Sequence, residues 1–264
     1  MNIYLHEWKM LQKSTWVWTF TLCVVLVFFF FLFPAFTREV EFTQRFMQAF
    51  PKIIQEIIGY SYETFFSAMG FYSFIFAYVV LLGSIQAMNL GLALLSKETR
   101  NKTVDFLLTK PITRNQILTE KILAGLTAIV ATNMVYFLLS ILMIKLISHN
   151  VFDAKALLLI NLSLFFVQSI FFSLGLLLSV ILSKIKSVIS VTLTTVFAFF
   201  ILDLFNSVVK EDMLRFIIPY KYFNVVYILN HGRYENLYLL ITIVFVITAV
   251  GATYQLYRKK DFLI

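Results

Sequence analysis

The chain has 264 residues, of which 60% are hydrophobic and only 14% are charged. A soluble globular domain averages about 45–50% apolar and about 25% charged residues, so this composition excludes a soluble enzyme, a disordered protein and a nucleic-acid-binding domain. The formal net charge of +8 therefore reflects membrane topology, and we expect no nucleic acid as a partner.

Six stretches of 22 to 33 residues contain no charged side chain except Asp203, which lies in the fifth stretch. Each stretch exceeds the ~20 apolar residues that cross about 30 Å of hydrocarbon as a helix. The sequence predicts an all-α integral membrane protein with one transmembrane domain over residues 1–264. Its six transmembrane helices are expected at residues 16–36, 70–95, 122–145, 156–182, 188–209 and 237–257.

The basic residues are distributed unevenly between the two sides of the membrane. Six spans place both termini on one side, together with residues 96–121 and 183–187. Residues 1–15, 258–264 and these two connections hold 13 of the 22 Lys and Arg residues but 5 of the 14 acidic residues. Because Lys and Arg concentrate in cytoplasmic segments, we expect a multi-pass protein of the cell membrane with both termini in the cytoplasm.

Residues 2–13 are predicted to form an amphipathic helix before the first span. Its apolar face and its basic face each have helical spacing, with Tyr4, Trp8 and Leu11 on one and His6, Lys9 and Lys13 on the other. Such a helix lies in the headgroup region with its basic face toward anionic lipid. The alternative is an ordinary basic flank of the first span.

The connection between the second and third spans contains a second short helix, predicted at residues 103–109. Val104, Leu107 and Leu108 share one face of it. Pro111 prevents the helix from continuing. The helix cannot bury its apolar face alone, so from the residues themselves it fits either a protein partner or the lipid surface.

A new helix is predicted to start directly after this break. Thr113 and Gln116 have the spacing of a capping box, and the chain then continues into the third span.

Several polar side chains lie inside the predicted spans. An intramembrane carboxylate marks a functional site by default, so Asp203, with Asn206 and Asn89, is the candidate intramembrane polar site. Asp203 is six residues from the end of its run, where it can also reach the interface. Amides in spans serve more often as hydrogen-bonding groups between helices, and this is the role expected of Gln86, Asn133, Asn161 and Gln168.

Residues 213–227 are apolar and aromatic but are interrupted by Pro219. We expect them to form either a hydrophobic cap on the ends of the spans or an interfacial or re-entrant piece, on the side of the membrane opposite the termini.

Several kinds of chemistry are excluded by spacing. No two of the eight glycines are five residues apart, so a phosphate-binding loop of the Gly-x4-Gly-Lys-Ser/Thr form is absent. The three histidines and the single cysteine, Cys23, are far apart in the sequence. We therefore expect no catalytic residue, no metal site and no nucleotide cofactor bound by this chain.

The connection at 96–121 also resembles a known family signature, that of type-2 ATP-binding-cassette (ABC) exporter permeases. In that family an acidic residue at the end of span 2 precedes Gly-Thr, an acid, Leu-Leu, a Pro-x-Ser/Thr-Arg turn and a Lys. The corresponding residues here are Glu98, Thr103, Asp105, Leu107, Leu108, Pro111, Arg114 and Lys121. Residues 218–224 and 257–262 also match, whereas Lys102 replaces the usual Gly.

The resemblance implies a membrane subunit that works with other chains. Residues 103–109 would be a coupling helix that docks on a separate ABC ATPase subunit. The residues that couple the chain to this subunit would be Glu98, Thr103, Val104, Asp105, Leu107, Leu108, Pro111 and Arg114. Residues 2–13 would be the elbow helix. A second permease subunit, identical or related, would complete the transporter, with ATP and Mg²⁺ on the ATPase.

Export of an antimicrobial peptide, drug or lipid is the function that the resemblance implies. Two alternatives stay open: a secondary transporter or channel, and a membrane scaffold or sensor subunit that carries no cargo.

Overall fold

The computed structural model describes residues 3–38, 67–101, 113–147, 152–182 and 185–259. Within these residues every regular element is a helix. The long helices are α1 (Ile3–Arg38), α5 (Ala68–Asn101), α7 (Arg114–Ile147), α8 (Ala154–Ile181), α9 (Val188–Val209) and α12 (Asn236–Lys259). Three short ones, α10 (Asp212–Arg215), η1 (Pro219–Lys221) and α11 (Val225–His231), lie between α9 and α12.

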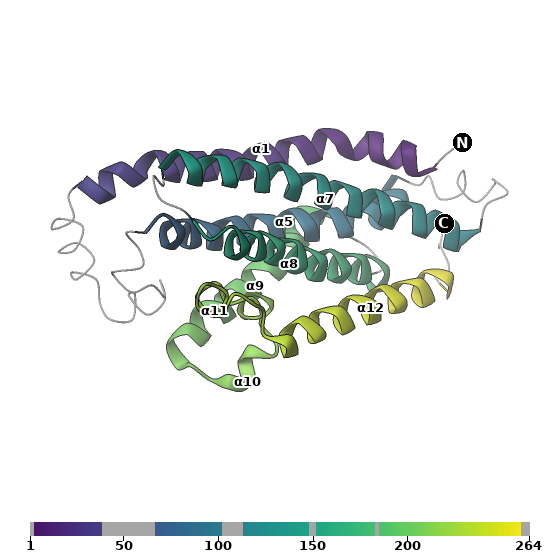
Figure 1. Ribbon diagram of the computed structural model, residues 1–264. Helices are drawn as coiled ribbons and strands as arrows, with labels where there is room; N and C mark the ends of the chain where they lie inside the picture. Colours follow the sequence, from purple (N-terminus) through teal and green to yellow (C-terminus); the bar gives the residue numbers. More distant parts are fainter. Residues whose placement is uncertain (1–2, 39–66, 102–112, 148–151, 183–184, 260–264) are drawn as a thin grey trace.

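Six of the described helices are long and apolar enough to cross a membrane, as the sequence predicts. Each expected span falls within one of them, except that Leu182 follows α8 as its C-cap. The first turns of α1 and α7 and the last turns of α5 and α12 share one end of the bundle (Figure 1), which we call the termini end.

Local side-chain chemistry sets where the helices begin and end. Asp153 caps α8 by accepting hydrogen bonds from the backbone N–H of Lys155 (2.9 Å) and of Ala156 (3.1 Å). The expected cap at Thr113 is present, because its Oγ1 accepts from the N–H of Gln116 at 3.3 Å. Such caps satisfy N–H groups that have no partner within the helix.

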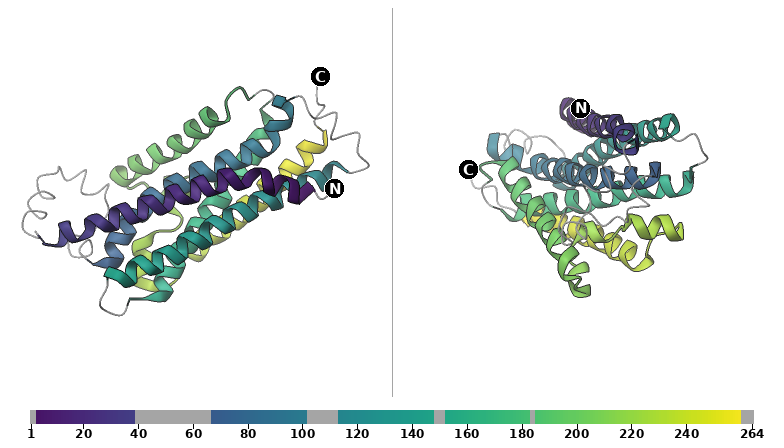
Figure 2. Two further views of the ribbon diagram at one scale, coloured as in Figure 1. Left: turned by 90° about the horizontal axis from the view of Figure 1, so that it is seen from above. Right: turned by 90° about the vertical axis from the view of Figure 1, so that its left-hand side faces the viewer.

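The long helices pack in three layers. α1 lies along α7, α5 lies along α8, and α9 and α12 pack on α5 and α8 from the other side, as the end-on view in Figure 2 shows. α5 and α8 are therefore the most buried of the six long helices, whereas α9 and α12 bury only a small share of their residues.

The contact between α5 and α8 depends on two glycines. A Cβ atom on Gly91 would lie 2.3 Å from the carbonyl oxygen of Phe172, and one on Gly175 would lie 2.7 Å from that of Met88. Small residues allow membrane helices to approach this closely. The two central helices thus meet backbone to backbone.

The N-terminal residues correct one expectation. α1 runs unbroken from Ile3 to Arg38, so residues 3–13 continue directly into the first long helix and are not a separate elbow helix. Its 36 residues make a helix about 54 Å long, which exceeds the ~30 Å of hydrocarbon. The first turns therefore extend beyond the span, where α7 holds them.

The two faces of this N-terminal stretch agree with the prediction. Tyr4, Trp8 and Leu11 are half-buried, and His6, Lys9 and Lys13 are exposed.

The segment between α9 and α12 folds back into the bundle at the end opposite the termini (Figure 1). Ile218 and Pro219 are buried, and the Tyr222 hydroxyl donates to the carbonyl of Phe216 at 2.5 Å. Arg215 forms an ion pair with Glu235 and lies 4.2 Å from the centre of the Tyr238 ring. Of the two expected forms, this segment is therefore the cap, built of short packed helices.

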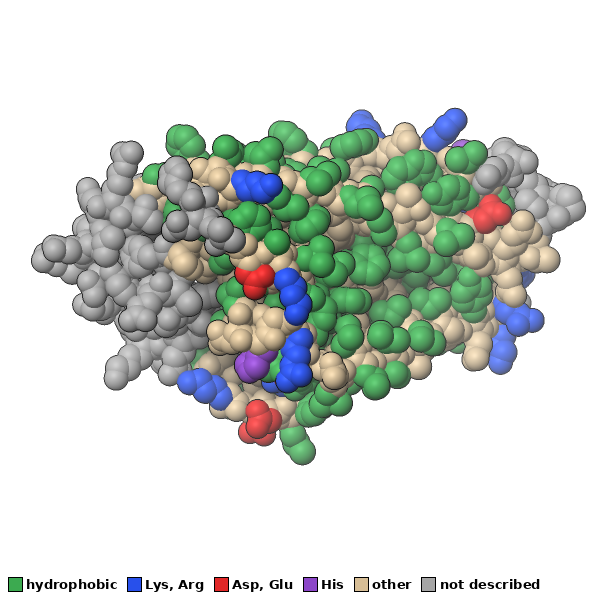
Figure 3. Space-filling model, viewed as in Figure 1, with side chains coloured by type: hydrophobic (Ala, Val, Ile, Leu, Met, Phe, Trp, Pro, Cys, Tyr) green, Lys and Arg blue, Asp and Glu red, His purple; other side chains and the backbone are tan. Residues whose placement is uncertain are grey.

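The surface agrees with a membrane setting. Apolar side chains cover the middle of the face in Figure 3, and charged side chains gather toward the two ends of the bundle.

Candidate functional site

Most of the predicted coupling residues lie outside the described part of the chain. These are Thr103, Val104, Asp105, Leu107, Leu108 and Pro111. Glu98 belongs to the last turns of α5, where only the backbone is described. Arg114 is the first residue of α7, so the structure describes the place where the chain leaves the 102–112 segment.

The first turns of α7 contain a buried lysine. The Lys121 ammonium donates to Glu7 Oε1 at 2.8 Å and to the carbonyl oxygen of Leu94 at 3.2 Å. The side chains of Lys121 and Glu7 are only 2% and 11% exposed. A buried charge is tolerated only when it is paired and hydrogen-bonded. This one group therefore ties α7 to α1 and to α5.

Further polar contacts fasten the same turns of α7. Glu120 Oε2 accepts from the backbone N–H of Tyr4 at 3.0 Å. Thr119 shares a hydrogen bond with the Tyr254 hydroxyl of α12 at 2.7 Å. Arg114 donates to the carbonyl oxygen of Arg258 at 3.2 Å. The helix that follows the predicted coupling segment is thus joined directly to α1, α5 and α12.

Glu7 is a site residue that the sequence argument missed, and Lys121 entered only as part of the family signature. The available signal was an acid within the otherwise basic residues 1–15 and a lysine at the start of an apolar run.

A chain of amides and hydroxyls crosses the centre of the bundle. Gln86 of α5 donates to Thr132 of α7 at 2.9 Å, and Thr132 also meets Thr19 of α1 at 2.9 Å. Gln168 of α8 donates to Gln86 Oε1 at 3.2 Å and accepts from Asn133 of α7 at 2.5 Å. Four helices are therefore linked at one level of the bundle.

A second group joins three of these helices, α5, α7 and α8, nearer the opposite end. The Tyr72 hydroxyl of α5 donates to Asn161 Oδ1 of α8 at 3.0 Å, and Ser140 of α7 donates to the same oxygen at 3.4 Å. These contacts agree with the expected role of the amides as hydrogen-bonding groups between helices.

The candidate residues Asp203 and Asn206 serve the cap at the opposite end. Asp203 Oδ1 lies 3.3 Å from the Lys221 ammonium, which also donates to Ser207 Oγ at 2.6 Å. Asn206 is buried and accepts from the backbone N–H of Glu211 at 3.1 Å. Both residues hold the chain as it leaves α9. Asn89 lies in α5, more than 120 residues before the cap helices, and lines a different pocket, between α1 and α5.

A pocket of about 210 Å³ lies beside the Asp203–Lys221 pair. Serine hydroxyls and aromatic rings from α5, α8, α9 and the cap form its wall, among them Ser73, Ser163 and Tyr220. Burial raises the pKa of the Tyr220 phenol well above its ordinary value, so this group stays neutral. The pocket is polar enough to admit water or a polar ligand from that side.

Metal binding finds no support within the described residues, which contain no group of three His, Cys, Asp or Glu side chains close enough to hold an ion.

Together, the six long apolar helices and the polar groups buried between them define a multi-pass membrane protein. The chain belongs to the family described as ABC-2 family transporter protein, which matches residues 1–261. No protein in the curated collection of known proteins matches it. The family agrees with the resemblance of the 96–121 connection.

Proposed function

We propose that the chain is the permease subunit of an ABC exporter whose ATPase is a separate chain. The observation that carries the proposal is the ABC-2 family match over residues 1–261. A permease of this kind would pair with a second permease subunit, identical or related. Two ATPase subunits would bind ATP and Mg²⁺, since this sequence contains no phosphate-binding loop.

Coupling to ATP would pass through the segment between α5 and α7. The ATPase would displace residues 103–109, and the first turns of α7 would move with them. Lys121 binds α1 and α5, and Thr119 and Arg114 bind α12. A displacement would therefore reach three other helices through direct contacts, which is a physical route for coupling.

The orientation and the cargo are parts of the same proposal. The excess of basic residues supports a cytoplasmic position for the termini end, which is where a cytoplasmic ATPase would dock. The cargo would be an antimicrobial peptide, a drug or a lipid, exported to the opposite side.

Copurification tests the proposal. The full chain should be coexpressed with a Walker-type ATPase encoded in a neighbouring reading frame, purified and reconstituted in lipid. We expect a stable complex that hydrolyses ATP, whereas the chain alone binds no nucleotide tightly. An ATPase that neither copurifies nor changes its rate of hydrolysis with the permease would contradict the assignment.

A further inference from the structure

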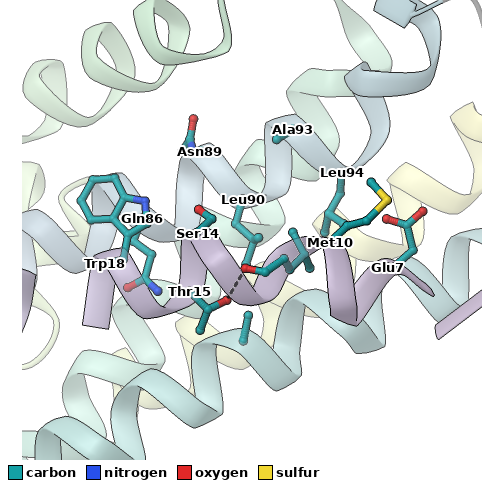
Figure 4. A pocket seen from close by; sticks show the side chains of 12 residues that line it. Glu7, Met10, Ser14, Thr15, Trp18, Gln86, Asn89, Leu90, Ala93 and Leu94 are labelled. Atoms are coloured by element: carbon teal, nitrogen blue, oxygen red, sulfur yellow. Dashed lines mark hydrogen bonds between the residues drawn. The ribbon is translucent and has the colours of Figure 1, made fainter. Parts of the chain in front are cut away.

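A second pocket, of about 150 Å³, lies between the first half of α1 and the last half of α5, toward the termini end (Figure 4). Trp18 and Gln86 lie at one end of it, and Glu7 and Leu94 lie at the other. Over this length the pocket separates the two helices.

At the end opposite the termini, α1 and α5 pack directly on each other through aromatic rings. The centre of the Phe33 ring lies 4.8 Å from that of Phe71, and the Phe30 ring lies 6.1 Å from the same ring. Phe29 stacks on Tyr78 at 5.6 Å. Ring pairs at these separations attract each other. α1 is thus fixed on α5 at one end and stands apart from it at the other.

The half of α1 that borders the pocket is held by α7. The backbone N–H of Tyr4 donates to Glu120 at 3.0 Å, and the Tyr4 hydroxyl shares a hydrogen bond with Thr127 at 3.0 Å. Thr19 shares a hydrogen bond with Thr132 at 2.9 Å. Between Tyr4 and Thr19, α1 rises about 22 Å, so these contacts enclose the whole length of the pocket.

α7 also stands between α1 and α5 at both ends of the pocket. Lys121 of α7 bonds Glu7 of α1 and a backbone carbonyl of α5. Thr132 of α7 bonds Thr19 of α1 and Gln86 of α5. These contacts connect α1 to α5 through α7. The first half of α1 can therefore turn about α7 without losing them.

The walls of the pocket favour its closure. Leu11 and Trp18 on α1 and Ala93 on α5 are apolar lining residues that remain partly exposed. Residues 7–15 precede the first expected span, so this part of the wall lies toward water. Removing apolar surface from water is favourable, and a movement of α1 onto α5 would remove it.

We propose that residues 3–18 of α1 form a hinged N-terminal arm that turns about its α7 contacts and closes on α5. The pocket is the space that the arm fills when it closes. The aromatic rings at the opposite end stay in place, and the hydrogen bonds to α7 are kept in both positions. The movement requires neither an ATPase nor a cargo, so it goes beyond the proposed function.

Distances between spin labels test the proposal. α8 serves as the reference, because its backbone contact with α5 holds these two helices together. In the full chain with Cys23→Ser, K13C/I181C places labels at exposed positions of the arm and of the termini end of α8. The chain is reconstituted in lipid vesicles, frozen and measured by double electron–electron resonance. Helix motions take microseconds to milliseconds, so freezing should trap both positions and broaden the distance distribution by about 2 Å.

Two further label pairs are the matched controls. K13C/L123C joins the arm to α7, and F31C/L158C joins α1 to α8 at the opposite end, all at exposed positions. Both distributions should be narrower than that of K13C/I181C, because the hinge keeps the first distance and the aromatic rings keep the second. Equal widths for the three pairs would overturn the proposal.

Filling the pocket is a second test. In the K13C/I181C chain, A93F places a ring in the space that the arm would occupy, so only the open position should remain and the distribution should narrow. A198F adds the same ring at an exposed position of α9 outside the pocket and should leave the distribution unchanged. A distribution that A93F does not narrow would also overturn the proposal. If A93F does not fold, the comparison of the three label pairs decides.

Discussion

At the residue scale, the pairing of Lys121 with Glu7 is the main departure from a simple apolar bundle. Burying two charges costs free energy that their attraction only partly returns. The Leu94 carbonyl adds a third partner to the ammonium. The pair thus contributes less to net stability than to the relative position of α1, α5 and α7.

Substituting Lys121→Met should leave the nearly buried Glu7 carboxylate without its cation. Removing one member of a buried pair costs about 3–5 kcal/mol, whereas replacing both members is often neutral. We therefore expect K121M to be strongly destabilised and E7Q/K121M to recover most of the loss. Reversible unfolding in mixed detergent micelles measures both, and K145M, at an exposed position of α7, is the matched control.

If K121M unfolds at the same detergent composition as K145M, the pair does not hold the helices together.

Asp203 lies inside the fifth predicted span, and its partner gives it a structural role. The side chains of Asp203 and Lys221 are 21% and 27% exposed. We expect D203N and K221M each to lower the free energy of unfolding by about 1–2 kcal/mol, with the double variant close to either single one. Strictly additive losses would show that the two residues act separately.

At the element scale, the sequence predicts the helices well because the signals are local. An apolar run of sufficient length and a side chain such as Thr113 at its start depend only on neighbouring residues. The continuity of α1 could not be predicted in this way. It depends on Glu7 and Tyr4 meeting Lys121 and Glu120, more than 110 residues away.

The same reasoning applies to the candidate site. Asp203 was identified from its position in a span, but its partner, Lys221, lies in a segment whose fold is set by packing. Asn89 lines the α1–α5 pocket, and neither helix alone contains that pocket.

The contact between α5 and α8 gives a prediction for whole elements. In G91A the new methyl group would lie 2.3 Å from the Phe172 carbonyl oxygen, and the central helices would have to separate. We expect a loss of about 1–3 kcal/mol in the free energy of unfolding. G251A is the control, because nothing lies within 4 Å of its new Cβ, and it should be neutral or stabilising. Equal effects of the two substitutions would mean that α5 and α8 tolerate separation.

At the scale of the whole molecule, orientation follows from charge. The chain enters the six-helix bundle with α1 and leaves it with α12 at the same end, the termini end, and Lys and Arg are in excess there. These two features predict that Lys102 is cytoplasmic and that Glu56 is on the opposite side. In a Cys23→Ser background, K102C and E56C should be labelled by a membrane-impermeant thiol reagent from opposite sides. Labelling of both from one side would contradict the topology.

Coupling to an ATPase gives the last prediction. Leu107 and Leu108 belong to the proposed coupling segment, and burial of a Leu side chain contributes about 1.5–3 kcal/mol at most. Since about 1.4 kcal/mol is tenfold in affinity, L107A/L108A should weaken ATPase association by an order of magnitude or more. The bundle should still fold, because its described helices do not include these residues.

The alternative, that residues 103–109 rest on the lipid surface, predicts a different result for the same variant. The ATPase would then copurify with L107A/L108A as it does with the unsubstituted chain. K121M/E7Q separates docking from transmission, since its residues lie in the bundle beyond the docking segment. We expect this variant to bind the ATPase normally. If the α7 contacts transmit the displacement of residues 103–109, cargo should stimulate ATP hydrolysis less in this variant than in the unsubstituted chain. Normal binding and normal transport by L107A/L108A would refute the coupling assignment.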